Sequence, residues 1–522
     1  MSDRLPIRRA LVSVFDKSGL ERLAAALARA GVELVATGQT AAALEDLGVA
    51  VSRVEAVTGA PELLDGRVKT LHPRIHAGLL ADRRRPEHLA QLERQGIAPF
   101  DLVVCNLYPF EEAVADPAVD PELAVERIDV GGPSMVRAAA KNFASVAVVC
   151  DPADYPLVDA ALAAGGTTLA QRRELAAKAF ARTAAYDAAV AAWLDPARAA
   201  PTGPAPGEAA AFPPVLALQG RRARRLRYGE NPHQPAAFYA TGAWGLATAE
   251  QLAGKELSYN NLLDADAALA LAAEFAAVPF AVIVKHTNPC GAAAGETLAA
   301  AYAAALDGDP VSAFGGVVAL TRPLDGPTAR RLAEVFTEVV AAPGFDPEAL
   351  AALAGKPSLR LLRVDPARPA GALAVRSVAG GLLAQAADPG GDDPAGWTLV
   401  SGRAPDPATL AELRLAWTVA AHLRSNAIAL VRDGRLVGAG AGQMSRVDAV
   451  RLAVAKAGER AGGAVAGSVA FFPFPDGIQA LAAAGVRAVA QPGGSVRDAE
   501  VTAAAAAAGL TMLHTGRRHF RH

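Results

Sequence analysis

A short unit near the start of the chain, a buried strand followed by a polar turn and a helix, recurs along the sequence and constrains the fold more than any other feature. Arg9–Val14 has the pattern of a short strand. A helix through Ala30 follows it, with an Asp or Ser from residues 13–18 as the expected N-cap. Residues 32–36 then predict a strand, 37–40 a polar turn and 41–47 a helix. This recurrence predicts a parallel sheet in an α/β fold.

Polar side chains follow the predicted strands of this first half. Residues 101–110 form another buried strand that ends in a polar cluster, and residues 128–134 lead into a helix at 135–142. A last strand is expected at 145–150, followed by Ala-rich helices from 155 to about 194. The loop 66–78 packs cationic side chains and two His residues, a density that is costly unless anions or solvent meet it. These groups would meet at one rim of a doubly wound sheet, although ordinary helix capping explains each turn equally well by itself.

The length of 522 residues exceeds what one hydrophobic core supports and indicates two to four domains. The stretch 196–214 is rich in Pro, Gly and Ala without a hydrophobic period, so we expect a linker there. The expected domains are 1–195, with an α/β core at about 1–150, and 215–522, with sub-domains at about 215–368 and 369–522.

Composition argues against several classes of protein. The 51 Lys and Arg against 53 Asp and Glu give a net charge of −2, so neither nucleic acid nor a membrane is expected as the main partner, whereas a small anionic substrate is compatible. No window reaches the roughly 18 bulky apolar residues of a membrane-spanning helix. Cys105, Cys150 and Cys290 fit neither a disulfide framework nor a zinc site. The start of the chain lacks an apolar signal region, which predicts a cytoplasmic protein.

A buried strand in the second half ends at Lys285 and His286, and the Asn-Pro-Cys-Gly that follows is expected to end regular structure. Lys beside His at a strand end offers a proton acceptor near neutral pH and a fixed positive charge for a developing oxyanion. An isolated pair would more often be a solvated Lys next to a packed His. Here, further polar clusters at 254–264 and 309–316 favour a site.

Two later segments are ambiguous when taken singly. Residues 438–448 predict a Gly-rich turn before a helix, but the spacing is only a weak match to a dinucleotide fingerprint. Residues 468–477 predict an aromatic wall with one carboxylate, suited to a flat heterocycle, although core packing explains each Phe equally well.

Ten blocks, in this order, carry a family resemblance: 65–72, 105–110, 129–142, 227–234, 255–264, 284–291, 425–427, 440–446, 471–474 and 518–522. Over nearly its whole length the chain resembles the bifunctional phosphoribosylaminoimidazolecarboxamide (AICAR) formyltransferase/IMP cyclohydrolase family of purine biosynthesis. The resemblance implies formyl transfer from 10-formyltetrahydrofolate, as co-substrate, to the 5-amino group of AICAR, giving FAICAR and tetrahydrofolate. Dehydrative ring closure of FAICAR to IMP follows, and neither step requires a metal or redox cofactor.

The resemblance also implies a fold and an assembly. The fold is a methylglyoxal-synthase-like doubly wound domain followed by two cytidine-deaminase-like α/β/α sub-domains without the zinc signature. The assembly is a homodimer with shared formyltransferase sites.

For formyl transfer, the resemblance gives His286 as proton acceptor, Lys285 as stabiliser of the tetrahedral intermediate or of the departing folate nitrogen, and Asn426 as the group that orients the carboxamide. The residues matched to AICAR binding are Arg227, Tyr228, His286, Gly315, Glu338, Asn426 and Arg446. Those matched to folate binding are Val447, Phe471, Asp476, Ser495, Val496 and Arg518.

For ring closure, the resemblance gives Lys141 as the proton shuttle, supported by Lys69, Tyr108 and Asp129. The residues matched to nucleotide binding are Phe15, Asp16, Lys17, Thr37, Gly38, Gln39, Thr40, Arg67, Val68, Lys69, Thr70, Cys105, Asn106, Asp129 and Val130. Gln39 departs from the family, which usually has a second Gly there, as Val469 departs from an acidic residue and Pro475 from a common Arg. An alternative is a monofunctional formyltransferase with a vestigial or regulatory nucleotide-binding N-terminal domain.

Overall fold

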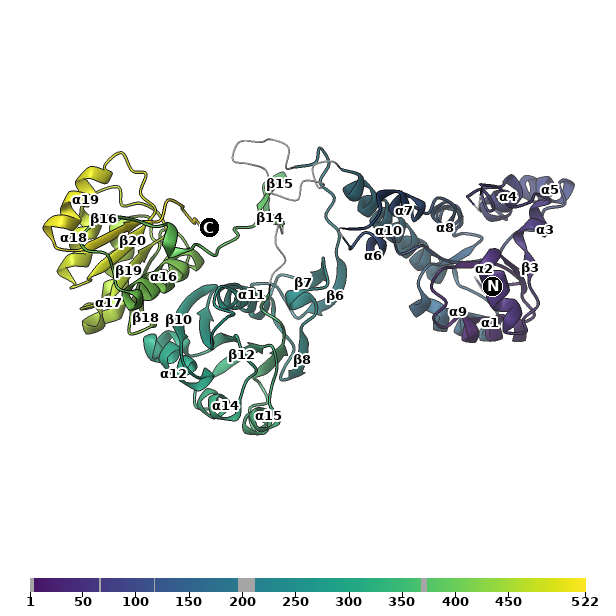
Figure 1. The fold of residues 1–522 in the computed structure, drawn as a ribbon. Coiled ribbons are helices and arrows are strands. Elements are labelled where there is room, and N and C mark those ends of the chain that lie inside the picture. The colour runs from purple at the N-terminus through teal and green to yellow at the C-terminus, as the bar shows by residue number, and fades with distance from the viewer. Residues whose placement is uncertain (1–3, 65–66, 117, 196–211, 368–372) are drawn as a thin grey trace. The chain divides into compact units, whose positions relative to one another are not determined.

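The computed structural model describes residues 4–64, 67–116, 118–195, 212–367 and 373–522 (Figure 1). The chain forms two compact units, Met1–Gln219 (unit 1) and Gly220–His522 (unit 2). Most of the predicted linker at 196–214 lies outside the described residues.

A parallel sheet forms the centre of unit 1. Its described strands are β1 Arg9–Val14, β2 Glu33–Ala36, β3 Ser52–Arg53, β4 Leu102–Asn106 and β5 Ala147–Val149. They lie in the order β3-β2-β1-β4-β5, and all four pairings are parallel, which confirms the predicted sheet.

Helices cover both faces of this sheet. They are α1 Leu20–Arg29, α2 Gly38–Asp46, α3 Val54–Thr58, α4 Pro73–Leu80, α5 Pro86–Arg94, α6 Phe110–Ala113, α7 Pro121–Glu126, α8 Gly131–Lys141, α9 Tyr155–Ala163 and α10 Leu169–Leu194. Successive residues of β1 point to opposite faces: Leu11 packs in the core under α4, α8 and α10, and Val12 in the core under α1, α2 and α9. The unit is therefore a doubly wound α/β domain.

Three local predictions in unit 1 are wrong. The predicted turn at 37–40 is largely the first turn of α2, which begins at Gly38, because extended Thr37 is already its N-cap. Helix α8 begins at Gly131 rather than at 135. The N-cap of α1 is Gly19, in the left-handed conformation at φ 71°, and no side chain caps this helix. Instead, the carboxylate of Asp16 accepts a hydrogen bond from the Ser18 amide.

A mixed sheet of twelve strands runs through the described part of unit 2. The strands are β8 Glu250–Ala253, β9 Phe280–Lys285, β10 Asn288–Ala294, β11 Gly316–Leu320, β12 Thr337–Ala342, β13 Arg360–Arg363, β16 Thr398–Ser401, β17 Ile428–Arg432, β18 Arg435–Gly440, β19 Val465–Ser468, β20 Ala488–Gln491 and β21 Thr511–His514.

Unit 2 is an internal duplication. Its sheet order is β16-β21-β20-β19-β17-β18 followed by β10-β9-β11-β12-β13-β8, so each half mirrors the other about the β18–β10 pair. The directions repeat too. One half has three antiparallel pairs, β9–β10, β9–β11 and β13–β8, and the other half has the three equivalent pairs, β17–β18, β17–β19 and β16–β21. The remaining pairs within each half are parallel. We call the halves the first and second repeat.

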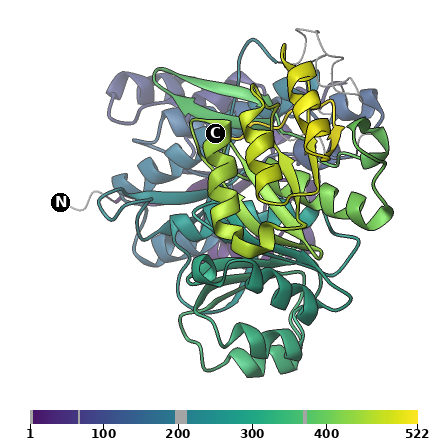
Figure 2. The same ribbon diagram turned by 90° about the vertical axis from the view of Figure 1, so that its left-hand side faces the viewer.

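The helices repeat with the strands. Helices α11 Tyr259–Ala273 and α16 Pro407–His422 share one core on one face of the sheet. On the other face lie α12 Leu298–Gly308, α14 Gly326–Leu332 and α15 Pro347–Leu353 in the first repeat, and α17 Arg446–Ala457, α18 Asp476–Ala483 and α19 Asp498–Ala507 in the second (Figures 1 and 2). The short helix α13 Pro310–Ala313 precedes β11.

The expected break after His286 is wrong, because Asn288–Ala294 is strand β10, paired antiparallel to β9. His286 and Thr287 form the two-residue turn between these strands, with φ of 52° and 61°. A tight turn with two positive φ values matches the twist of a hairpin, which lets the strand resume at once. The same turn in the second repeat, between β17 and β18, is Asp433-Gly434, with φ of 52° and 70°.

The expected Gly-rich turn at 438–448 is also partly wrong. Gly438 and Gly440 lie in strand β18, and a Cβ on either would collide with a backbone carbonyl of α17, from Ala453 or Ala449. These glycines therefore allow the helix to pack closely on the strand.

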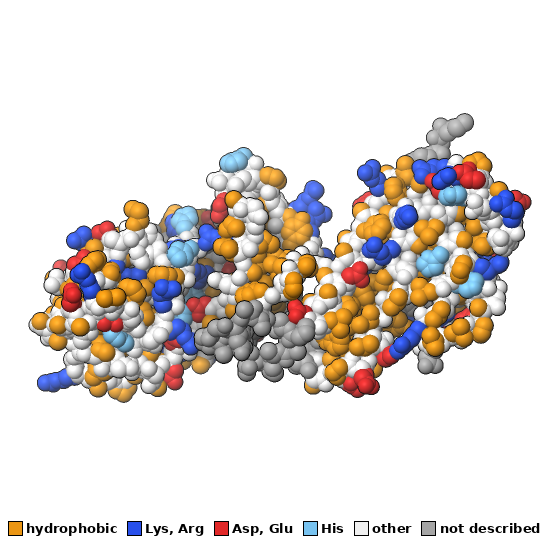
Figure 3. All heavy atoms as spheres, turned by 90° about the horizontal axis from the view of Figure 1, so that it is seen from above, with side chains coloured by type: hydrophobic (Ala, Val, Ile, Leu, Met, Phe, Trp, Pro, Cys, Tyr) orange, Lys and Arg blue, Asp and Glu red, His pale blue; other side chains and the backbone are white. Residues whose placement is uncertain are grey.

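Two hairpins stand beside the large sheet: β6 Arg221–Leu226 with β7 Ala236–Ala240, and β14 Leu373–Val378 with β15 Gly381–Ala386. Within the described ranges, no helix is long and apolar enough to cross a membrane. On the face drawn in Figure 3, Lys and Arg side chains are interspersed with Asp and Glu rather than gathered into one field, in keeping with the net charge of −2.

Candidate functional sites

The sheet of unit 1 has a crevice at its topological switch point. In the sheet, β2 lies on one side of β1 and β4 lies on the other. The chain segments that follow β1 and β4 therefore lead away from one another beyond the strand ends. Asn106 ties these loops together: its Oδ1 accepts from the amides of Phe15 at 2.6 Å and Asp16 at 2.9 Å, and its Nδ2 donates to the Asp16 carbonyl at 2.8 Å.

Lys69, in the loop before α4, reaches the start of α2. A Cβ on Gly38 would lie 2.9 Å from the Nζ of Lys69, so the start of α2 leaves room for the ammonium only because residue 38 is Gly. The Oγ1 of Thr70 similarly approaches Gly131, at the start of α8. Two helix starts and a lysine therefore converge, an arrangement that favours an anion.

Asp129 lies under the start of α8. Its Oδ1 accepts from the Gly132 amide at 2.8 Å, and its own amide donates to the Tyr186 hydroxyl at 2.7 Å. Burial raises the pKa of Asp129, so this carboxyl takes up a proton more readily than a solvated one. The ring of Tyr108 lies 5.1 Å from the ring of Phe15, and both are substantially exposed.

The remaining nucleotide candidates of unit 1 have different surroundings. Thr37 and Thr40 are buried and bind the end of β1 through Ser13 and Val14, whereas Val130 is 59% exposed. Cys105 is buried, and burial holds the pKa of its thiol well above the usual value, which argues against a thiolate role. Asp16, Lys17, Gln39, Arg67 and Val68 lie on the loops and helix starts described above.

Lys141 is not brought to this crevice in one copy of the chain. It is the last residue of α8, whereas Asp129 lies just before the first turn of that helix. The side chain of Lys141 lines a separate cavity of about 860 Å³ with Arg84, Arg85 and Arg173. The sequence did not show how far Lys141 lies from Asp129, because that distance depends on the full length of α8.

The candidate formyltransferase residues share one edge of the sheet in unit 2. Three antiparallel pairings separate β9 from β17, through β10 and β18, so β9 and β17 run in opposite directions. The carboxyl end of β9, with Lys285 and His286, therefore lies at the same edge as the amino end of β17, with Asn426. Arg424 connects the repeats there, because its amide donates to Oδ1 of Asn288 at 3.1 Å.

Lys285 is anchored beside Gly315. Its Nζ donates to the Phe314 carbonyl at 2.6 Å and lies 4.0 Å from the position of a Cβ on Gly315. The His286–Thr287 turn is held by Asp264 of α11, whose Oδ1 accepts from the Thr287 amide at 2.6 Å. Sequence reasoning placed Asp264 at the end of a matched block without giving it a role.

Asn426 and Arg446 form the polar centre of the second repeat. The Nη2 of Arg446 donates to Oδ1 of Asn426 at 2.7 Å, and its Nη1 donates to the Ala427 carbonyl at 3.1 Å. Burial lowers the pKa of Arg446 to about 10. The Ser425–Asn426 peptide bond is cis.

Most folate candidates follow three neighbouring parallel strands. Phe471 comes after β19, Ser495 and Val496 after β20, and Arg518 after β21, so all lie at the edge that carries Asn426. Asp476 is exposed at the start of α18, and Val447 is half-buried in the first turn of α17. The expected aromatic wall is only partly present, because Phe472 is fully buried in the core.

The ribotide candidates of the first repeat lie on neighbouring elements. Glu338 is near the start of β12 and accepts from Nδ2 of Asn261 at 2.6 Å. The guanidinium of Arg227 lies over the ring of Tyr228, 5.3 Å from its centroid, in the loop after β6. Among the described residues, neither Arg227 nor Tyr228 forms a hydrogen bond or ring contact with His286.

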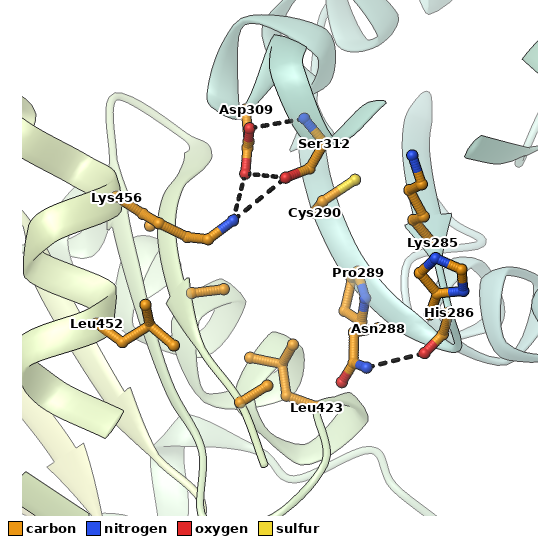
Figure 4. Close-up of a pocket in the computed structure, with 13 residues that line it drawn as sticks. Lys285, His286, Asn288, Pro289, Cys290, Asp309, Ser312, Leu423, Leu452 and Lys456 are labelled. Atoms are coloured by element: carbon orange, nitrogen blue, oxygen red, sulfur yellow. Dashed lines mark hydrogen bonds and ion pairs between the residues drawn. The ribbon is translucent and has the colours of Figure 1, made fainter. Parts of the chain in front are cut away.

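A cavity of about 230 Å³ lies between the repeats, with Lys285 and His286 on the wall opposite Lys456 (Figure 4). The Nζ of Lys456 lies 2.8 Å from Oδ2 of Asp309 and 3.2 Å from Oγ of Ser312. Burial acts to raise the pKa of Asp309, but these partners outweigh it and the pKa is lowered. Sequence reasoning missed Lys456, since nothing near residue 456 marks it as a partner of Asp309.

Among the residues that the structure describes, no group of three or more His, Cys, Asp or Glu side chains is placed to hold a metal ion.

Two family models and two relatives agree on the family of this chain. The family model described as "AICARFT/IMPCHase bienzyme" matches residues 139–456, and that of the "MGS-like domain" matches residues 19–134. Proteins named bifunctional purine biosynthesis protein PurH from Mycobacterium marinum (strain ATCC BAA-535 / M) and Mycobacterium ulcerans (strain Agy99) are each 54% identical over 525 residues, covering 99% of this chain and 99% of the relative. A solved chain described as "Crystal structure of ForH" is 42% identical over 35% of this chain and 97% of that chain, with a TM-score of 0.33.

Proposed function

Because this chain belongs to the AICARFT/IMPCHase bienzyme family, we propose that the two groups of residues described above divide its two reactions between the two units. The protein is a bifunctional formyltransferase and cyclohydrolase of the last two steps of IMP synthesis, with 10-formyltetrahydrofolate as co-substrate. The observation that supports the division is the gathering of formyl-transfer candidates at one edge of the sheet in unit 2, while the nucleotide candidates lie on the strand ends, loops and helix starts of unit 1.

In unit 2, the 5-amino group of AICAR attacks the formyl carbon of 10-formyltetrahydrofolate. This amine is a weak nucleophile, because its lone pair is delocalised into the ring and the carboxamide. We assign His286 to accept the amine proton and Lys285 to stabilise the oxyanion of the tetrahedral intermediate or the departing folate nitrogen. Asn426, oriented by Arg446, holds the carboxamide. The folate lies across the loops that carry Phe471, Asp476, Ser495 and Arg518.

In unit 1, the carboxamide nitrogen of FAICAR attacks the formyl carbon and water leaves. The ribotide phosphate is bound where Lys69 meets the helix starts at Gly38 and Gly131. Tyr108 and Asp129 support the proton transfers, and the raised pKa of Asp129 suits a group that gives and takes a proton. Lys141, at the far end of α8, is the proposed shuttle.

The native assembly is proposed to be a homodimer in the cytoplasm. The β14–β15 hairpin supports a dimer, because Leu373, Val378, Leu382 and Leu383 are all more than 40% exposed on a two-stranded ribbon that its own unit leaves uncovered.

The two repeats of unit 2 are proposed to be cytidine-deaminase-like, and the domain boundaries to follow the linker at 196–214.

A coupled absorbance assay tests the proposal. Purified protein receives AICAR and 10-formyltetrahydrofolate, and tetrahydrofolate and IMP are followed together, with His286→Ala as the control. Formation of both products, and loss of tetrahydrofolate formation in the variant, supports both assignments. If tetrahydrofolate forms without IMP even when FAICAR is supplied, unit 1 is vestigial or regulatory.

A further inference from the structure

The C-terminal segment places a buried imidazole between two carboxylates. His519 is 4% exposed. Its Nδ1 lies 2.5 Å from Oδ2 of Asp388, and its Nε2 lies 2.7 Å from Oδ2 of Asp392. Because an ionised carboxylate only accepts hydrogen bonds, both ring nitrogens carry a hydrogen and the ring is an imidazolium. Neither proposed reaction uses this group directly.

The carboxylates that hold His519 come from a distant part of the chain, the segment between β15 and β16. Asp392 also accepts from Nε1 of Trp417 at 2.9 Å and pairs with Arg517 at 3.1 Å. The ring of Trp417 packs edge-on against the ring of His519, with 5.6 Å between centroids. The imidazolium thus fastens the C-terminal segment to α16 and to the segment after β15.

The same C-terminal segment supports the loop that carries Asn426. The Ser425 amide donates to the Arg521 carbonyl at 2.8 Å, and the Arg521 amide donates to the Ser425 hydroxyl at 3.0 Å. Arg424 donates to the carbonyl of the terminal His522. The amide of His519 itself donates to the Val469 carbonyl at 3.2 Å, just before Phe471.

We propose that His519, held as an imidazolium between Asp388 and Asp392, is a positioning residue for formyl transfer. It fixes the C-terminal segment, and through that segment it sets the Ser425–Asn426 loop and the place of Arg518. The inference rests on the proposed assignment of Asn426 and Arg518 to the formyl-transfer site. His519 touches no reacting atom in this scheme and acts only through its neighbours.

The His519 imidazolium with Asp388 and Asp392, which we call the clamp, depends on pH in a defined direction. The charged or titratable groups around the ring are Asp388 and Asp392, Arg517 on its own segment, and His422 of α16, which faces Glu274 of α11 at 3.7 Å. Burial acts to lower the pKa of His519, but the two carboxylates outweigh it and raise the pKa above 6.5. The clamp is therefore complete below pH 6.5 and is lost as pH rises through the raised pKa.

The experiment compares full-length His519→Gln with the unchanged protein, with tetrahydrofolate formation and FAICAR cyclisation measured separately between about pH 6 and 9. The glutamine donates to only one carboxylate and carries no charge. We expect KM for 10-formyltetrahydrofolate to rise about tenfold and formyl-transfer kcat to fall. The variant should also lack the decline of formyl transfer at alkaline pH (the alkaline decline) that the raised pKa of His519 predicts for the unchanged protein. Cyclisation in unit 1 should stay within about twofold and reports correct folding of that unit. Formyl transfer within about twofold of the unchanged protein at every pH overturns the proposal.

Three further variants keep the test decisive if His519→Gln folds poorly. Asp388→Asn alters a side chain that is 53% exposed and removes one of the stabilising charges, so the alkaline decline should move to lower pH; an unmoved decline overturns the proposal. Asp393→Asn is the matched control, because the Asp393 carboxylate accepts a hydrogen bond from the Ala395 amide, whereas the ring of His519 is held by Asp388 and Asp392. Asn426→Ala separates the two levels of inference: full activity there refutes the Asn426 assignment, whereas a loss there beside an unaffected His519→Gln refutes the clamp alone.

Discussion

The Nη2 of Arg446 donates a hydrogen bond of 2.7 Å to Oδ1 of Asn426. Arg446 is 7% exposed, and no carboxylate is paired with its guanidinium among the described residues. One planar group thus fixes the amide of Asn426 and brings an uncompensated positive charge to the edge where the ribotide is proposed to bind. The planar guanidinium of an arginine can both orient the amide and supply the charge, whereas the ammonium of a lysine cannot.

Arg446→Lys keeps the positive charge but removes the planar set of guanidinium donors. We expect KM for AICAR to rise about tenfold or more and kcat for formyl transfer to fall, because Asn426 loses its orienting donor. Steady-state kinetics with AICAR varied measures both quantities, and FAICAR cyclisation serves as the internal control. An unchanged KM would falsify the placement of Arg446 in the ribotide site.

Asp264 holds the turn that carries His286. Asp264→Ala removes the acceptor of the Thr287 amide and should slow formyl transfer by about tenfold, whereas Asp264→Asn, which retains an acceptor oxygen, should lose less. The pair of variants is compared in the tetrahydrofolate assay. Equal losses in the two variants would show that the charge matters rather than the hydrogen bond.

The pH dependence of stability gives a second test of Asp264. Burial raises its pKa above 3.8, so the folded protein binds the proton more tightly than the unfolded chain does. The free energy of unfolding of unit 2, relative to Asp264→Asn, should therefore fall as pH rises from below 3.8 through the raised pKa and then stay constant. Urea denaturation at several pH values measures this difference, and a rise with pH would contradict the assigned direction.

Gly38→Ala places a methyl group 2.9 Å from the Nζ of Lys69, so the ammonium must move. The displaced lysine side chain moves easily, so the loss of stability should come mainly from the positive φ of 29° at residue 38, about 1 kcal/mol, while cyclisation should slow about tenfold with formyl transfer unchanged. Gly31→Ala is the control: its φ of 67° is also positive, but an added Cβ meets nothing within 4 Å. Equal cyclisation in the two variants would remove Lys69 from the phosphate site.

Lys69→Ala and Lys141→Ala distinguish the crevice from the far end of α8. Lys69→Ala should weaken nucleotide binding and cyclisation together, by about a hundredfold in kcat/KM, the scale of losing a charge-assisted contact to a phosphate. If Lys141 shuttles the proton, its variant binds IMP normally and fails to cyclise FAICAR. Arg173→Ala, in the same cavity as Lys141, is the control. Normal cyclisation in Lys141→Ala would end its assignment as the shuttle.

The turn at His286-Thr287 should carry a measurable folding cost. Replacing it by Asp-Gly, the pair found in the equivalent turn of the second repeat, should stabilise unit 2 by about 1 kcal/mol, because the Gly adopts positive φ without a steric penalty. Formyl transfer is lost with His286, so the readout is the denaturation midpoint of unit 2. A lower midpoint would mean that the side chains of His286 and Thr287 stabilise the turn.

Elements whose residues carry their own signal could be predicted from the sequence. The strand Arg9–Val14 and the strand ending at Lys285 match the structure, because buried β-branched runs and the polar residues that end them are local features. The first residue of α2 and α8 could not be predicted, since Gly and Thr signal both turns and helix starts. The strand after His286 was missed because Asn-Pro-Cys-Gly normally ends a strand, whereas here a two-residue turn sends the chain back into the sheet.

Contacts between residues far apart in the sequence were the main feature that could not be predicted. Nothing near Asp388 or Asp392 indicates His519, and nothing near Asp309 indicates Lys456, because these pairs exist only once the sheet has brought the two repeats together. The family resemblance supplied candidate residues but not their distances. It therefore placed Lys141 with Asp129, although one helix length separates them in a single copy.

The single pairing of β10 with β18 fixes how many sites unit 2 has. Between β9 and β17 the direction of the chain reverses an odd number of times, which brings the functional ends of both repeats to one edge. An even number would have left His286 and Asn426 at opposite edges, as two half-sites that never meet. The parity of strand reversals thus lets a duplicated scaffold present one proposed formyl-transfer site, to which each repeat contributes residues that the other lacks.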